Sequence, residues 1–274
     1  METTPSSTAP RISMDKAELI AKVAQDGEDR LLLAHILDKY QQFQRRNIPV
    51  STEFLSPREQ AMAEAVLRTA GVRSGYAFDG GYEAAERKVL LFLPDWAEGE
   101  QGELAFLRAD FHGPDSALTH RDILGSLMGL GVARERVGDI LVGEHSADIV
   151  ASPSLRDFFL REWAQAGRVR LTVAEIGRED LLVPVLQVKN IRDTVSSLRL
   201  DAVLSSGFSM SRGRAAELIA AGRVSLDHVP CVKGDKLVSE GSVLSVRGLG
   251  RAKLTEVGGL SRKGRTGITI ERYL

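Results

Sequence analysis

The sequence contains a single cysteine, Cys231, and no hydrophobic run long enough to cross a membrane. One cysteine excludes an internal disulfide framework, and its position between Pro230 and Val232 predicts a core residue of a hairpin rather than a reactive thiol. A transmembrane helix needs about 20 consecutive apolar residues, and the start of the chain lacks the apolar segment of a signal peptide. We therefore expect a cytoplasmic protein without membrane contacts.

Sequence motifs that bind nucleotides, methyl donors or metal ions are also absent. There is no glycine-rich strand-to-helix turn and no Ser/His/Asp set in a recognisable local context. Asp110, His112, His120 and Asp122 lie close in the sequence, but their spacing fits no standard ligand pattern, and an acid such as Asp122 suits the first turn of a helix. We predict no catalytic residue, no cofactor and no metal.

The net charge of −1 conceals two regions of opposite charge. From Lys189 to Arg272 there are 15 basic and 8 acidic residues, a balance of +7, whereas the preceding part has 21 basic and 29 acidic residues, a balance of −8. A basic terminal third on an acidic body is expected when one region binds phosphate and the rest does not. The sequence therefore predicts a nucleic-acid contact in its last third.

The fold class that the patterns predict is α+β, and its first part is helical. Residues 1–13 are rich in Thr, Ser and Pro and are expected to form a disordered tail. Residues 14–74 predict a helical module, with two helices separated near Asp26-Gly27. A third helix is expected after the capping box Ser56–Glu59, and Gly71 should end it.

Residues 75–180 predict a ferredoxin-like, RRM-like α/β domain. Apolar alternation indicates strands at KVLLFLP, LAFLRADF, DILVG, ADIVAS and VRLTVAEI, with helices after the expected N-caps Thr119 and Ser152. This order suits one sheet with both helices on one face. RNA-recognition folds stack bases on sheet aromatics, but Phe92, Phe106 and Phe111 lack the aromatic-glycine-aromatic spacing of that family, so we expect them to pack in the core.

Residues 187–274 predict a small domain of two helices followed by short strands, with a further strand extension at its C-terminus. Apolar residues at helical spacing follow Arg199, Gly207 ends that helix, and Ser211 can cap a second helix that ends at Gly222. A turn at Lys233–Asp235 then separates strand-like segments.

This stretch resembles the S4 domain, a small RNA-binding domain named after a ribosomal protein of the small subunit. The residues that carry the resemblance are Arg199-Leu200-Asp201, Gly207, Ser211-Arg212, Ala215, Ile219, Gly222-Arg223-Val224, the region of Lys236, Gly241, Val246-Arg247-Gly248 and Gly250-Arg251. Two positions depart from it: many relatives have Asn-Gly in place of Asp227-His228 and an acid in place of Ser242. Base contacts at the first hairpin therefore do not follow from the resemblance.

Arginines at helix ends can hold a phosphate with two parallel hydrogen bonds. We expect Arg199, Arg212, Arg214 and Arg223 to do so, and Asp201 to orient Arg199 or to cap the first helix. The full set of candidate RNA-binding residues is Arg199, Asp201, Ser211, Arg212, Arg214, Arg223, Lys233, Lys236, Arg247, Arg251 and Lys253.

Nearly the whole chain resembles the YlmH family of bacterial proteins. The matching segments are Gly80-Gly81-Tyr82-Glu83, Glu86-Arg87-Lys88, Leu118–Asp122, Gly138-Asp139-Ile140, Gly258-Gly259 and Lys263-Gly264-Arg265. The resemblance implies a monomeric protein that binds ribosomal RNA and tRNA on the large ribosomal subunit. It also implies a role in the rescue and quality control of stalled translation, through tRNA that is held while the nascent chain receives a non-templated tail.

Two other functions stay open at this point. Arg199-Leu200-Asp201 is similar to a motif of pseudouridine synthases, in which the aspartate is the nucleophile, so the protein could be an RNA-modification enzyme that uses Asp201. Against this, only 24 residues follow Gly250, too few for the catalytic domain of such an enzyme. In the other alternative, the acidic first two-thirds form a platform for protein partners, and RNA serves only as the docking site.

Overall fold

The computed structural model describes residues 14–97, 99, 101–112, 118–183, 187–261 and 264–273. The tail expected over residues 1–13 lies outside these ranges. The chain divides at residues 184/185 into two compact units. Within the described ranges, no helix combines the length and the hydrophobicity that crossing a membrane requires.

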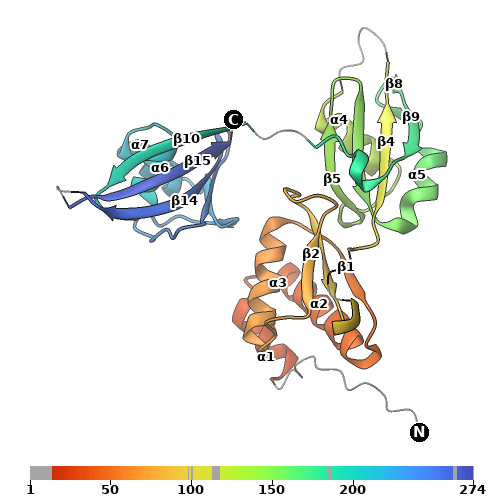
Figure 1. Cartoon of the computed structure of the whole chain (residues 1–274), viewed down its shortest axis with the longest axis horizontal. Helices are drawn as coiled ribbons and strands as arrows, with labels where there is room; N and C mark the ends of the chain where they lie inside the picture. Colours follow the sequence, from red (N-terminus) through yellow and green to blue (C-terminus); the bar gives the residue numbers. More distant parts are fainter. Residues whose placement is uncertain are drawn as a thin grey trace. The chain divides into compact units, whose positions relative to one another are not determined.

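The first unit begins with an N-terminal module, residues 14–97, that contains the three expected helices (Figure 1). They are α1 (Lys16–Val23), α2 (Gly27–Arg46) and α3 (Pro57–Thr69). The Asp26 carboxylate caps α2 by accepting a hydrogen bond from the Asp29 backbone, and Ser56 and Glu59 form the predicted capping box of α3. Gly71 follows α3 with a positive φ of 82°, which glycine adopts without strain.

This module is not purely helical, because it also contains a three-stranded antiparallel sheet in the order β1-β3-β2. Its strands are β1 (Val50–Leu55), β2 (Tyr76–Asp79) and β3 (Lys88–Phe92). Strands β1 and β2 were not predicted from the sequence, and β3 was assigned to the ferredoxin-like sheet. That assignment was wrong: β3 is apolar on both faces, and periodicity cannot tell which of two sheets a fully buried strand joins.

The middle module, residues 101–183, has the predicted ferredoxin-like topology. Its principal elements are β4 (Ala105–Asp110), α4 (His120–Gly129), β5 (Val137–Val142), β6 (Ser146–Ala151), α5 (Arg156–Glu162) and β9 (Thr172–Glu175). The sheet is antiparallel in the order β5-β6-β4-β9. A short hairpin of β7 (Gln165–Ala166) and β8 (Val169–Arg170) precedes β9.

Short 3-10 helices complete the first unit. They are η1 (Asp95–Ala97), η2 (Arg134–Arg136), η3 (Pro153–Leu155) and η4 (Arg178–Asp180). Thr119 forms a capping box with Asp122 at the start of α4, as predicted. Ser152 makes no cap hydrogen bond. Its hydroxyl instead contacts Arg136 and Glu53, and η3 separates it from α5.

The two faces of the ferredoxin-like sheet are both covered. Helices α4 and α5 pack on one face, where Leu107, Ile123, Ile149 and Phe159 share a core. The opposite face packs against the N-terminal sheet in a second core of Phe54, Val89, Leu91, Phe106, Leu141 and Val150. Phe92, Phe106 and Phe111 are buried, which confirms that they pack in cores rather than stack bases.

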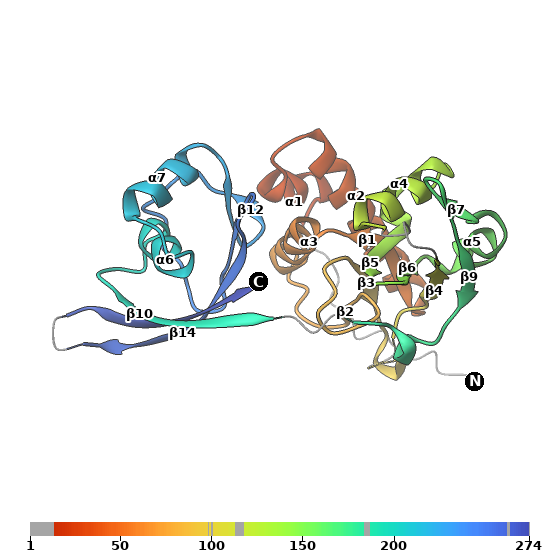
Figure 2. The same cartoon turned by 90° about the horizontal axis from the view of Figure 1, so that it is seen from above.

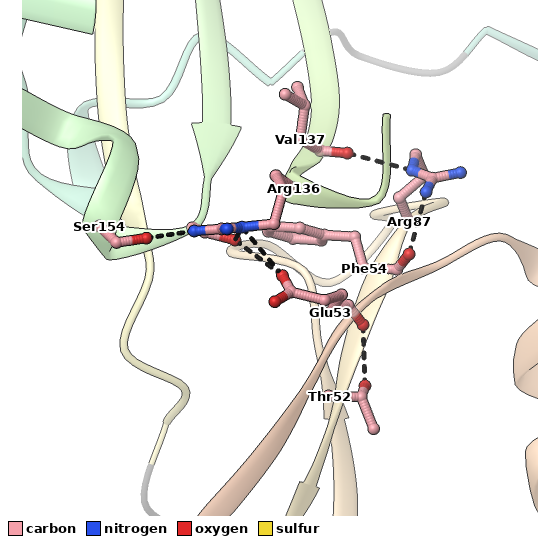
Figure 3. Close-up of polar contacts among 8 residues, drawn as sticks. Thr52, Glu53, Phe54, Arg87, Arg136, Val137 and Ser154 are labelled. Atoms are coloured by element: carbon pink, nitrogen blue, oxygen red, sulfur yellow. Dashed lines mark hydrogen bonds and ion pairs between the residues drawn. The ribbon is translucent and has the colours of Figure 1, made fainter. Parts of the chain in front are cut away.

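Polar contacts join the two modules beside this second core (Figure 3). Arg136 of η2 reaches Glu53 of β1, with 3.2 Å between Nε and Oε2, and also bonds Ser154. Arg87 donates to the backbone oxygens of Val137, at 3.1 Å, and Phe54, at 2.9 Å. These bonds satisfy backbone carbonyls where the two sheets meet, as buried polar groups require.

Three of the segments that resemble the YlmH family, residues 80–83, 86–88 and 138–140, contribute to this junction. The Asp139 carboxylate accepts bonds from the Tyr82 hydroxyl and from the backbone of Glu86 and Arg87, at 2.6–3.0 Å. A Cβ at Gly138 would lie 2.7 Å from the Phe54 ring, so only glycine fits. These motif residues therefore hold the modules together rather than forming a surface site.

The second unit is a six-stranded antiparallel sheet with two helices. Its elements are β10 (Val188–Val195), α6 (Leu200–Gly207), α7 (Arg212–Ala220), β11 (Val224–Leu226), β12 (Val229–Pro230), β13 (Val243–Val246), β14 (Gly250–Leu260) and β15 (Thr266–Tyr273). The strand order is β10-β15-β14-β13-β11-β12. Both helices lie on one side of the sheet (Figure 2).

Candidate nucleic-acid interface

Close packing fixes the two helices of the second unit on the sheet. Leu200, Leu204 and Ile219 are buried in the same core as Leu254 and Ile270. A Cβ at Gly207 would lie 3.3 Å from an Ile270 methyl carbon, which is tighter than an ordinary contact, so glycine lets α6 approach the sheet. The basic residues at the helix ends therefore extend from a rigid backbone.

An arginine–aspartate cluster, which we call the Asp201 cluster, lies where α6 and α7 begin. Arg199 donates from Nε and Nη2 to the Asp201 carboxylate at 3.3 and 3.1 Å, and Arg212 donates from Nη2 to both oxygens at 3.0 and 3.2 Å. Asp201 therefore orients Arg199, as predicted, and orients Arg212 as well. It does not cap α6, because the N-cap residue is Arg199, whose side chain makes no cap hydrogen bond.

The three side chains of the Asp201 cluster differ in their solvent exposure. The Asp201 side chain is 10% exposed, whereas those of Arg199 and Arg212 are 40% and 49% exposed. Burial alone would raise the pKa of Asp201, but the hydrogen bonds from Arg199 and Arg212 outweigh it, so the pKa lies below its ordinary value. One ionised carboxylate thus holds two guanidinium groups, and Nε and Nη1 of Arg212 remain unused by Asp201.

The loop that follows β12 adds two lysines to this site. The backbone of Leu200 donates to the Lys236 oxygen at 2.8 Å, and that of Asp201 donates to the Gly234 oxygen at 3.0 Å. These bonds fix the loop against the start of α6, so Lys233 and Lys236, both exposed, belong to the same surface. Val232 and Leu237, which flank the predicted turn, are 61% and 68% exposed. They were not among the site residues predicted from the sequence.

The other arginines at helix ends are placed differently. Arg214 pairs with Glu217 at 2.9 Å on the exposed side of α7. The Ser211 hydroxyl accepts a bond from the Arg214 backbone at 3.1 Å, so Ser211 acts as the predicted cap. Arg223 donates from Nη2 to the Arg247 oxygen at 3.0 Å, which puts these two exposed arginines side by side after α7. Their contact with RNA stays a prediction.

Arg251 and Lys253 do not join the Asp201 cluster. They alternate along β14 with Ala252 and Leu254, which are buried beneath the helices. Successive side chains of a strand point to opposite faces, so Arg251 and Lys253 lie on the sheet face away from α6 and α7. There, Arg251 lies over the Tyr273 ring, 6.0 Å from its centroid.

The two positions that depart from the S4 pattern contact each other. Asp227 and His228 both have a positive φ, 49° and 66°, so the turn between β11 and β12 has the conformation that Asn-Gly favours. The Asp227 carboxylate accepts a bond from the Ser242 hydroxyl at 3.1 Å and one from the Val243 backbone at 2.8 Å. The hairpin therefore forms with Asp227-His228 in place of Asn-Gly, and Ser242 donates a hydrogen bond to Asp227.

Asp122, one of the residues considered as a metal ligand, forms hydrogen bonds at the start of α4. Both the backbone and the hydroxyl of Thr119 donate to Asp122, at 2.9 and 2.6 Å, and these bonds lower the pKa of Asp122. Asp122 thus serves the start of α4. Across the described ranges, no group of three or more His, Cys, Asp or Glu residues could hold a metal ion.

Comparison with protein families assigns two domains to the chain. Residues 103–180 match the family described as "Putative RNA-binding domain in YlmH", and residues 198–244 match the S4 domain. The two matches coincide with the ferredoxin-like sheet and with the part of the second unit that contains the Asp201 cluster.

Two proteins with known sequences or structures are similar to this chain. The ribosome-associated protein quality control protein P2 of Bacillus subtilis is 36% identical over 223 residues, which are 81% of this chain and 86% of the relative. The solved structure of the cell division protein ylmH from Streptococcus pneumoniae is 23% identical, with a TM-score of 0.46, and the match covers 57% of this chain and 96% of that one.

Proposed function

Because the chain belongs to the YlmH family and contains an S4 domain, we propose that it is a non-enzymatic RNA-binding protein that associates with the ribosome. The relative from Bacillus subtilis is named for ribosome association and protein quality control. We extend that role to this chain: it binds structured ribosomal RNA, tRNA or both on the large ribosomal subunit and acts on stalled translation.

The Asp201 cluster carries the proposal. It presents two half-exposed guanidinium groups that a buried carboxylate holds in place, next to the exposed Lys233 and Lys236. A guanidinium held in one orientation loses less side-chain entropy when it binds a phosphate. The cluster therefore suits the RNA backbone, which protein cations recognise largely through charge and shape.

The geometry of the Asp201 cluster also argues against the alternative of an RNA-modification enzyme that uses Asp201 as its nucleophile. Both oxygens of Asp201 accept hydrogen bonds from arginine side chains, and the low pKa keeps the carboxylate ionised. A nucleophilic carboxylate would need a free oxygen directed at its substrate. Asp201 is therefore better suited to orient arginines than to attack a uridine.

The double variant Arg199→Ala/Arg212→Ala of the full chain tests this proposal. Filter binding to tRNA and to ribosomal RNA should show an affinity at least tenfold lower, and the slope of log affinity against log salt should fall by about two, since two phosphate contacts are lost. Co-sedimentation with large ribosomal subunits should decrease in parallel.

A matched control replaces two exposed arginines of the N-terminal module, Arg68→Ala/Arg73→Ala, and should leave binding within about twofold. Equal affinity of the cluster variant and the wild type would refute the proposed site. If Asp201→Asn abolished a nucleotide modification in cellular RNA while RNA affinity stayed unchanged, the protein would instead be a modification enzyme.

A further inference from the structure

We propose that the middle module binds RNA through its helical side, on a surface that we call the hairpin face. This face consists of the end of α5, the β7–β8 hairpin and the adjoining side of α4. It is distinct from the Asp201 cluster, and the proposal stands without that site. The matched family model describes an RNA-binding domain, and the structure indicates which face performs that role.

The sheet face cannot bind RNA in the manner of an RNA-recognition fold. Such folds stack bases on exposed aromatic residues of the sheet. Here, Phe106 and Val150 pack against Phe54 and Leu91 of the N-terminal module. The Arg178 guanidinium also lies 5.2 Å from the centroid of the Phe106 ring. Because this face is buried inside the first unit, RNA contacts of the domain must use another side.

The hairpin face carries three arginines in ten residues, Arg161, Arg168 and Arg170. All three side chains belong to exposed residues, and within the described ranges none of them forms an ion pair or a side-chain hydrogen bond. Glu162 is the single acid between Arg161 and Arg170. The nearby Arg156 differs, because it pairs with Glu175 at 2.7 Å. The segment is therefore locally basic on a body that is otherwise acidic.

The hairpin adjoins α4 on a side that a ligand can approach closely. Trp163 donates from Nε1 to the Ser126 hydroxyl at 2.9 Å, which joins the end of α5 to α4. Next to Ser126 on the helix, Gly125 and Gly129 are exposed, and a Cβ at either position would meet no atom within 4 Å. The packing of the described residues does not require these glycines, and they leave the backbone of α4 accessible on its exposed side.

Charge favours RNA over a protein as the occupant. Unpaired arginines on a solvated surface attract phosphate with little desolvation cost. Within the described ranges, the large exposed apolar side chains are Leu31, Ile48, Trp96, Leu182, Val183, Val188, Val232, Leu237, Leu249 and Leu260. None of them belongs to the hairpin face, whereas a protein interface is expected to have an apolar centre.

The experiment uses the full chain with Arg199→Ala/Arg212→Ala as background, so that the S4 contact is weakened in every sample. Binding of a labelled RNA hairpin with a single-stranded loop is measured for the background and after addition of Arg168→Glu/Arg170→Glu. The control adds Arg68→Glu/Arg73→Glu, which changes the charge by the same amount on the N-terminal module. We expect an affinity at least about tenfold lower than the control, and a salt slope smaller by about two.

Equal affinity of the hairpin-face variant and the control would overturn the proposal. The proposal would also be overturned if the hairpin-face variant kept its RNA affinity but no longer co-sedimented with ribosomes. That result would assign the hairpin face to a protein partner. The two variants must unfold at the same temperature for their RNA affinities to be compared. If they do not, wild-type protein is photocrosslinked to RNA that contains 4-thiouridine, and the crosslinked residues are identified. Crosslinks to the hairpin face, within residues 120–129 or 161–170, support the proposal, and their absence refutes it. Failure of the Asp201 cluster would appear separately, as equal affinity of the background and the wild type.

Discussion

Two arginine–aspartate arrangements, one in each unit, use the same chemistry for different purposes. In the middle module, Asp148 is fully buried and accepts two bonds from Arg108, at 2.7 and 2.8 Å, and one from the Leu182 backbone at 2.8 Å. In the second unit, Asp201 holds two guanidinium groups at 3.0–3.3 Å, and both arginines are about half exposed.

The Arg108–Asp148 pair has a structural role, whereas the Asp201 cluster has the features of a binding site. Arg108 makes a bidentate bond and also donates to the Asp180 backbone oxygen, so its guanidinium is committed within the fold. At the Asp201 cluster, two cations share one anion, which leaves positive charge at the surface. A buried pair is costly to break, whereas an exposed pair contributes little stability and stays available for a ligand.

The largest expected effect follows from removal of the buried partner. Asp148→Ala removes the carboxylate partner of Arg108 and the acceptor of the Leu182 backbone, so we expect the free energy of unfolding of the first unit to fall by about 3 kcal/mol. Urea unfolding followed by tryptophan fluorescence measures this, since Trp96 and Trp163 both lie in the first unit.

The control for that variant is Asp157→Ala, which removes an exposed carboxylate beside Arg156 and should leave the transition where it is. RNA affinity of the Asp148→Ala protein, measured at a temperature at which it is folded, should stay near the wild-type value. An unfolding transition equal to that of the control would contradict the structural role assigned to Asp148.

A second variant, at Ser211 beside the Asp201 cluster, separates an effect on stability from an effect on RNA binding. Ser211→Asp keeps a side-chain oxygen that can cap α7, and a negative charge suits a helix N-terminus, so unfolding should change by less than about 0.5 kcal/mol. The new carboxylate lies beside Arg212 and Arg214, where it repels phosphate. We expect RNA affinity in filter binding to fall about tenfold.

Ser211→Asn provides the matched control, because it caps the helix without adding charge. It should bind RNA like the wild type. If Ser211→Asp bound RNA equally well, phosphates would not approach the start of α7.

The smallest effect concerns pH. The pKa of Asp201 is lowered in the folded protein, so its contribution to stability is present above its unfolded pKa and is lost as the pH falls through its folded pKa. At pH 7, Asp201→Asn should therefore exchange the amides of α6 up to about fivefold faster than the wild type, and near pH 3 this difference should shrink. Hydrogen exchange with mass spectrometry measures both. A difference that grew on acidification would mean that Asp201 is not held ionised by Arg199 and Arg212.

Local sequence signals predicted individual elements well. The capping box at Ser56 and the cap at Ser211 both form, because such motifs depend on residues three positions apart. The S4 helices follow from periodicity and a family resemblance, and the ferredoxin-like fold follows from the order of strands and helices along the chain. The sequence did not predict which strands pair with each other. Strand β3 is buried on both faces, and its register with β1 depends on residues 33 to 42 positions away.

The basic last third, the caps at Ser56, Thr119 and Ser211 and the residues available to bind phosphate can be predicted from local sequence. Which of these residues lie together depends on the tertiary structure. It brought Arg199, Asp201 and Arg212 together through the packing of α6 against α7, and it placed Arg251 and Lys253 on the opposite sheet face. It also buried Phe106, on the sheet of the middle module, between two modules. The physical reason is that a surface forms from side chains distant in the chain, and local pattern carries no information on which faces are covered.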